Sequence, residues 1–155
     1  TLHPNLGVVN QDNKEFVIAD IPGLIEGANE GAGLGHRFLG HVERCKALLH
    51  LIDVTSENVE KDYLTIIKEL KAYNTDLARK DQIVVLTKSD SASKQKIDDA
   101  TKKLKKHKIT NTIGISSVSG ENISRLIRKL QDIISINMKN EVIDDQQHKV
   151  DSWSP

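Results

Sequence analysis

The chain has 155 residues, which is enough for one domain with its own hydrophobic core. Its 22 Lys and Arg residues balance its 22 Asp and Glu residues, so the net charge gives no global sign of nucleic-acid binding. The single cysteine, Cys45, excludes an internal disulfide and is typical of a reducing cytosol. No apolar run approaches the length of a membrane span and no signal peptide is visible, so we expect a cytoplasmic protein.

Short apolar runs alternate with helical patterns along the chain, which is typical of an α/β domain with a mostly parallel sheet. Residues 7–9 and 15–19 are expected to form two strands joined by a hairpin-like turn at 10–13. A buried strand is expected over residues 47–54. The amphipathic helix after it is expected to begin at Ser56, a residue type that caps helices well.

The second half of the chain continues this pattern with strands over residues 83–86 and 112–115. A lysine-rich helix over about residues 93–107 separates them, and a last amphipathic helix begins near Ile123. From about residue 139 the apolar periodicity is lost, and residues 138–155 are expected to form a flexible polar tail after a domain over residues 1–137.

Asp20-Ile21-Pro22-Gly23 follows the first apolar pair of strands. A carboxylate at the end of a strand, before a turn of Pro and Gly, is how nucleotide-hydrolysing α/β domains present an Asp to a metal. Gly23 has no Cβ, so its backbone N–H can come close to a terminal phosphate. The pattern is short and would often arise by chance, but two segments in the right order support it, residues 87–90 and 116–118.

Thr87-Lys88-Ser89-Asp90 stands at the end of a predicted buried strand, where ligands bind in open α/β sheets. Asp90 can accept two hydrogen bonds from the adjacent N–H groups of guanine, whereas adenine would leave its carboxylate unpaired. Lys88 can lay its aliphatic stem along the purine face. The alternative is a polar turn in which Ser89 or Ser91 caps the next helix.

These three segments resemble the third, fourth and fifth motifs of the translation-factor-related GTPases. Residues 1–9, the glycine-rich run 23–35 and residues 38–45 look like the Obg family specifically. The resemblance covers roughly residues 1–137 and implies a Ras-like P-loop GTPase fold, a three-layer α/β sandwich with a mostly parallel sheet. It implies that the intact protein is a monomer that hydrolyses GTP to GDP and phosphate with Mg²⁺ and acts in the assembly of the large ribosomal subunit.

The resemblance also implies roles for single residues. Thr1 and Asp20 are expected to hold Mg²⁺, and Gly23 to donate its N–H to the γ-phosphate. Leu24 stands where Ras-like enzymes place a water-orienting Gln, so the catalytic group is unknown and slow turnover is expected. Thr87 replaces the usual Asn, which is expected to weaken guanine binding. The residues expected to contact nucleotide are Thr1, Leu2, His3, Asp20, Ile21, Pro22, Gly23, Thr87, Lys88, Ser89, Asp90, Ser116, Ser117 and Val118.

The sequence contains no G-x-x-x-x-G-K-S/T segment, the loop that holds phosphates in P-loop enzymes. It also begins with Thr rather than Met. We therefore expect a piece of a longer protein that lacks the first strand, the phosphate loop and the first helix of its fold. Such a piece is expected to be poorly stable and to bind GTP weakly or not at all.

Two other functions stay open at this stage. One is a nucleotide-free GTPase-like module that docks on the ribosome or on a protein partner. The other is an ATPase of related fold, against which Asp90 argues. The lysines over residues 102–108 can contact ribosomal RNA, although a solvated helix face is the simpler interpretation. His36, His41 and His50 lack a convincing metal-binding spacing.

Overall fold

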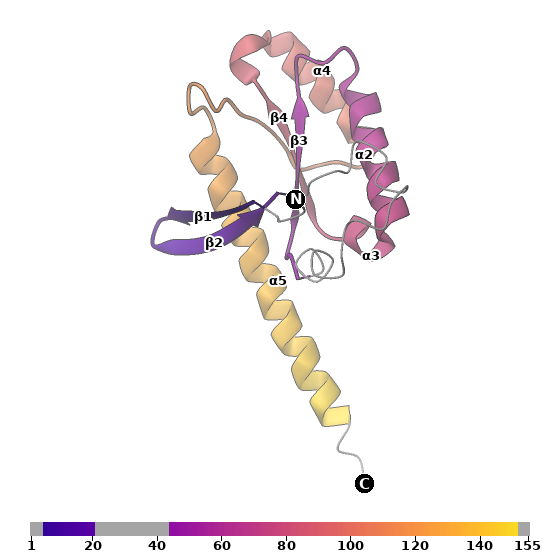
Figure 1. The fold of residues 1–155 in the computed structure, drawn as a ribbon, viewed down its shortest axis with the longest axis vertical. Helices are drawn as coiled ribbons and strands as arrows, with labels where there is room; N and C mark the ends of the chain where they lie inside the picture. The colour runs from indigo at the N-terminus through magenta and orange to yellow at the C-terminus, as the bar shows by residue number, and fades with distance from the viewer. Residues whose placement is uncertain (1–4, 21–43, 152–155) are drawn as a thin grey trace.

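The structure, a computed structural model, describes residues 5–20 and 44–151. Within these ranges the strands form a two-stranded antiparallel hairpin and a separate three-stranded parallel sheet. Helices flank the parallel sheet, and the long last helix passes beside the hairpin on its way to the C-terminus (Figure 1). No helix in the part of the chain described here has the length and apolar character needed to cross a membrane.

The hairpin consists of β1 (Leu6–Gln11) and β2 (Lys14–Ala19), which pair along their full length. Its two turn residues, Asp12 and Asn13, have positive φ angles of 55° and 57°. A two-residue hairpin turn needs this left-handed conformation, and Asp and Asn adopt it more readily than most residues. The hairpin predicted from the sequence is therefore confirmed.

The parallel sheet has the strand order β3 (Leu48–Asp53), β4 (Gln82–Thr87) and β5 (Thr112–Gly114). β4 is the central strand, and its four consecutive aliphatic side chains from Ile83 to Leu86 are 0% exposed. A strand that is buried on both faces must lie between two layers of other elements. The β4 sequence therefore marks the middle of the core.

Helices connect and cover these strands, and their bounds agree with most of the sequence-based expectations. The elements are α2 (Val59–Tyr73), α3 (Thr75–Ala78), the 3₁₀ turn η2 (Ser89–Ser91), α4 (Lys94–Lys105) and α5 (Ile123–Asp151). α2 and α4 contact each other, α2 contacts β3, and α4 contacts β5.

Two clusters of buried side chains fill the two faces of the parallel sheet. Val84 and Leu86 of β4 pack in the cluster that holds α2 and α4, where Leu104 is 0% exposed. Ile83 and Val85, which alternate with them along the strand, pack in the cluster that holds α5. Three layers result, α2 and α4, then the sheet, then α5, and the predicted α/β fold class is confirmed.

The start of α2 differs from the prediction, which placed the cap at Ser56. The cap is Asn58, whose side-chain oxygen accepts a hydrogen bond from Lys61 N at 3.0 Å. The Ser56 hydroxyl instead donates to the carboxylate of Asp62 in the first turn of the helix. Ser and Asn cap equally well, so composition alone could not choose between two candidates that lie two residues apart.

The last helix also differs, because α5 continues to Asp151 whereas a flexible tail was predicted from residue 138. That prediction was wrong for residues 138–151. The apolar side chains of Ile136, Met138 and Val142 are 57%, 54% and 56% exposed, so this part of α5 does not pack on the sheet. Apolar periodicity reports packing against a neighbour, and an unpacked helix has no need of it.

Candidate functional site

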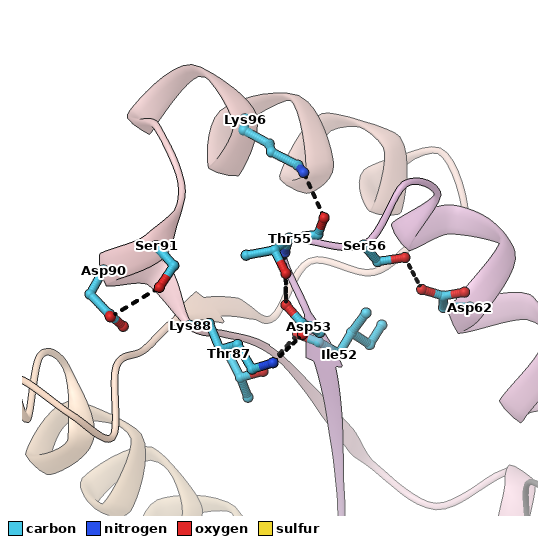
Figure 2. A network of polar contacts seen from close by, with 10 residues as sticks. All are labelled: Ile52, Asp53, Thr55, Ser56, Asp62, Thr87, Lys88, Asp90, Ser91 and Lys96. Atoms are coloured by element: carbon cyan, nitrogen blue, oxygen red, sulfur yellow. Dashed lines mark hydrogen bonds and ion pairs between the residues drawn. The ribbon is translucent and has the colours of Figure 1, made fainter.

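Polar side chains gather at the edge of the parallel sheet where its strands end (Figure 2). Asp53 is the last residue of β3 and Thr87 the last residue of β4, and the two stand opposite each other in the strand register. Ser116 follows β5 at the same edge. In open α/β sheets, ligands bind at the carboxyl ends of the strands. The structure thus places two of the predicted segments, residues 87–90 and 116–118, at one edge together with Asp53.

An ion pair links the ends of β3 and β4. Lys88, the first residue after β4, has the left-handed angles φ 58° and ψ 38°, and its Nζ lies 2.6 Å from Asp53 Oδ2. The other carboxylate oxygen of Asp53 accepts hydrogen bonds from the backbone N and the Oγ1 of Thr55, at 2.8 and 2.6 Å. The hydrogen bond from Lys88, supported by those from Thr55, lowers the pKa of Asp53 to about 2.

Two more hydrogen bonds fix the surroundings of this pair. Lys96 of α4 donates from its Nζ to the backbone oxygen of Thr55 at 2.8 Å. The hydroxyl of Thr87 donates to the backbone oxygen of Ile52 at 3.2 Å, and so joins β4 to β3 (Figure 2). The Thr that replaces the usual Asn therefore makes a contact within the sheet.

Asp90 is exposed and lies on the other side of the β4 end. A hydrogen bond with Ser116 is the main cause that lowers the pKa of Asp90, and the hydroxyl of Ser91 donates to the same carboxylate at 3.2 Å. Ser116 is 0% exposed. The carboxylate is thus charged at neutral pH and open to a ligand. The structure brings together Asp90 and Ser116, which the sequence predicted to meet the same base.

The alternative role of this turn as a helix cap is wrong. α4 is capped by Ser93, whose hydroxyl accepts from Lys96 N at 3.2 Å. Ser89 is buried and donates to Glu121 Oε2 at 2.9 Å, while Ser91 donates to Asp90. Ser93 therefore caps α4, and the residues of the turn 88–91 do not.

The loop after β5 is held against this turn. Ser89 N donates to the backbone oxygen of Ile115 at 3.0 Å, and Ser116 N donates to the backbone oxygen of Glu121 at 3.2 Å. Ser117 and Val118, two further predicted contacts, are exposed at the start of the loop, Val118 to 88%. Their side chains are open to an incoming ligand.

Asp20 lies directly after β2, and its N–H donates to the backbone oxygen of Asn5 at 2.9 Å. Its side chain is exposed. A carboxylate oxygen is the kind of ligand that Mg²⁺ takes, so the chemistry of Asp20 fits the predicted metal role. Among the described residues, no group of three or more His, Cys, Asp or Glu could hold a metal ion. The predicted site residues outside the described ranges are Thr1, Leu2, His3, Ile21, Pro22 and Gly23, together with Leu24.

The sequence analysis missed Asp53. The signal was available, because Asp53 ends a buried apolar strand in the same way that Asp20 ends β2. Asp53 belongs to none of the motifs identified in the sequence. For its partner, Lys88, the sequence analysis predicted only that the aliphatic stem contacts the purine. The position of the Lys88 ammonium group was not predicted, because it depends on the register between β3 and β4.

Comparison with known proteins relates this chain to GTPases. A family model described as 50S ribosome-binding GTPase matches residues 1–88. A structure of nucleolar GTP-binding protein 1 from Plasmodium falciparum is similar over 95% of this chain and 78% of that chain, with 15% identity and a TM-score of 0.61. At that identity the similarity supports the fold, and it agrees with the Ras-like P-loop GTPase architecture predicted from the sequence.

Two structures of Era are similar at higher identity. Era in complex with MgGDPNP and nucleotides 1506–1542 of 16S ribosomal RNA is 27% identical, with a TM-score of 0.60. Era from Aquifex aeolicus bound to GDP·AlF4⁻ is 25% identical, with a TM-score of 0.62. Each match covers 84% of this chain but 44% of the Era chain, so the chain spans less than half the length of these relatives.

Proposed function

Because the chain belongs to the 50S ribosome-binding GTPase family, we propose that the strand ends of its parallel sheet bind the guanine base of GTP and GDP. The observation that supports this most directly is Asp90, an exposed carboxylate at the end of β4 with Ser116 beside it. Asp90 accepts from the ring N–H and the exocyclic amine of guanine. The loop that begins with Ser116 and Ser117 lies at the guanine carbonyl, and the stem of Lys88 covers one face of the purine.

The phosphate end of the nucleotide lies, in this proposal, near the end of β2. Asp20 and Thr1 are the residues that would hold Mg²⁺, and Gly23 would donate its N–H to the γ-phosphate. When bound there, Mg²⁺ would supply positive charge to the phosphate oxygens. Water attacks the γ-phosphorus, and GDP and phosphate are released. Leu24 cannot orient that water, so the whole protein hydrolyses GTP slowly without a further group or a partner.

We further propose that the chain belongs to the Obg family. In this proposal the whole protein acts in the assembly of the large ribosomal subunit in the cytoplasm. The glycine-rich run 23–35 supports the first part, and the family's description as 50S ribosome-binding supports the second. The lysine-rich face of α4 is a candidate contact for ribosomal RNA, because Era, a relative of similar fold, is seen with such RNA. The exposed lysines are Lys102, Lys103 and Lys105 at the end of α4, followed by Lys106 and Lys108 just after it.

Nucleotide titration of the whole protein tests the proposal. In the presence of Mg²⁺ we expect GTP to bind at least about 100-fold more tightly than ATP, because adenine presents an acceptor where guanine donates to the Asp90 carboxylate. Asp90→Asn is expected to lose most of that preference. Asp98→Asn, which removes an exposed carboxylate from α4, is the matched control and should behave as the parent.

Equal affinity for GTP and ATP, or affinity for neither, would contradict the proposal. The second result would favour the nucleotide-free interaction module, which the lack of a G-x-x-x-x-G-K-S/T segment keeps open for this chain.

A further inference from the structure

We propose that Asp53 is a positioning residue for the base site: it anchors the ammonium group of Lys88, so that the Lys88 stem lies across the strand ends as a platform for the purine. The inference rests on the proposed guanine site. It adds to that site a residue from β3 that belongs to none of the motifs identified in the sequence.

The first argument is the direction in which Lys88 extends. Asp90 lies toward Ser116, which follows β5 on one side of the central strand β4. Lys88 reaches the opposite way, to Asp53 at the end of β3, with 2.6 Å between Nζ and Oδ2. Figure 2 shows Asp90 and Asp53 on opposite sides of Lys88. The stem therefore crosses the end of β4 beside the carboxylate that reads the base edge.

The second argument is that Asp53 is itself held in place. Both Thr55 donors bind Asp53 Oδ1, which leaves Oδ2 for Lys88. The carbonyl of Thr55 is bound in turn by Lys96 from α4. The anchor is thus held directly by Thr55 in the turn after β3, and indirectly by Lys96 of α4. A carboxylate with two local hydrogen bonds has few conformations left to lose when it pairs with a lysine.

The third argument concerns the cost of ordering Lys88. The side chains of Lys88 and Asp53 are 62% and 37% exposed, so neither is fixed by burial. A free lysine side chain loses much rotamer freedom when a ligand packs against its stem. The ion pair orders the stem before the nucleotide arrives, and a pre-ordered site binds more tightly because less freedom is lost on binding. Asp53 contributes to affinity without touching the base.

A double-mutant cycle on guanine nucleotide affinity tests the proposal. In the whole protein, Asp53→Asn is expected to weaken GDP binding about two- to fivefold, the range that exposed ion pairs support. In a Lys88→Met background the same change is expected to have no effect, because the group that it positions is gone. Thr55→Val, which removes one support of the carboxylate, is expected to give a smaller loss than Asp53→Asn.

A matched control comes from another exposed pair of this chain. Asp12 lies 2.9 Å from Arg128, with side chains 53% and 62% exposed, and it is in the β1–β2 turn away from the strand ends. Asp12→Asn removes an ion pair of the same kind. It is expected to leave GDP affinity unchanged.

A second measurement needs no nucleotide. The Asp53 contact raises the pKa of the Lys88 amine and shields it, so Asp53→Asn is expected to increase the acetylation rate of Lys88 at least twofold. Lys71, an exposed lysine of α2, serves as an internal reference in the same mass spectrometry experiment.

The outcomes separate this inference from the proposed function. If the parent protein binds no guanine nucleotide, the proposed function fails. If the parent binds GDP and Lys88→Met weakens binding, but Asp53→Asn costs the same with or without Lys88, the role of Asp53 is structural and this inference alone is overturned. Unchanged Lys88 acetylation in Asp53→Asn would overturn it as well.

Discussion

His50 on β3 is a histidine that the fold keeps neutral. It is 9% exposed, and its ring stacks on Tyr63 of α2 with 5.3 Å between the ring centroids. Its Nε2 is buried and has no hydrogen-bond partner in the described part of the chain. Burial disfavours the charged form, and it lowers the pKa of His50 from 6.5 to about 4.

This pKa predicts a loss of stability in mild acid. The unfolded chain binds a proton near pH 6.5 and the folded chain only near pH 4, so stability is full above pH 6.5 and falls as the pH drops between these values. The difference between the two pKa values corresponds to a loss of about 2 kcal/mol of unfolding free energy when the pH falls from 7 to 5. Urea denaturation at both pH values measures it. His50→Phe, which keeps the stacking, should remove this part of the pH dependence, and an unchanged dependence would show that another group causes it.

The sequence predicted which residues of the site lie together where this follows from their position at the end of a strand. Asp90 and Ser116 follow neighbouring parallel strands, so their proximity follows from the sheet alone. The ion pair of Lys88 with Asp53 was not predicted, since it depends on which residue of β3 stands opposite the end of β4. The contacts expected from residues 1–3 and 21–23 stay predictions, because these residues lie outside the described ranges.

Among the helices, α2 offers a direct comparison of a predicted cap with the observed one. Asn58→Ala is expected to lower the unfolding free energy by about 1 kcal/mol, because the N–H of Lys61 then loses its acceptor. Ser56→Ala is the matched change at the predicted cap, and it removes a hydrogen bond to the half-buried carboxylate of Asp62 instead. Denaturant unfolding of the two variants should rank Asn58→Ala as the more damaging. The reverse order would support the cap predicted from the sequence.

Elements that pack on the sheet were predicted well, and the element that leaves it was not. The helix predicted over about residues 93–107 is α4, and its buried residues Ala100 and Leu104 recur at the spacing expected for a helix. The C-terminal part of α5 is fixed by polar contacts near its base: Asn137 Nδ2 donates to the backbone oxygen of Lys46 at 2.7 Å, and Lys46 pairs with Glu141. Such contacts leave no apolar pattern in the sequence.

For the molecule as a whole, the main feature is that its two sheets do not pair with each other in the described ranges. The parallel sheet and the hairpin both contact α5, and Phe16 of β2 packs at the edge of the α5 cluster. The hairpin leaves Val8 and Val17 65% and 57% exposed, and the parallel sheet leaves Leu51 of β3 57% exposed. The sequence predicted the strands. Their division into two sheets depends on contacts between residues that are more than 100 positions apart in the sequence. The low stability predicted for the chain stays a prediction.

Gln131 carries much of the link between α5 and the hairpin. It is 6% exposed, and its side-chain nitrogen donates to the backbone oxygens of Gln11 and Lys14, at 2.9 and 3.4 Å, on either side of the hairpin turn. Gln131→Met keeps the length of the side chain and removes the donor, so two carbonyl groups next to a buried position lose their partner. The expected cost is about 1–3 kcal/mol, and it should appear as a local release of the hairpin.

Amide hydrogen exchange distinguishes this local release from general destabilisation. In Gln131→Met we expect faster exchange in β1 and β2, while β3, β4 and β5 keep their protection, because the core of the parallel sheet does not depend on this contact. Arg128→Met removes the exposed ion pair with Asp12 at the same turn and is the matched control, with a cost below about 1 kcal/mol. Equal loss of protection in both sheets would mean that the hairpin and the parallel sheet unfold as one unit, with α5 transmitting the change between them.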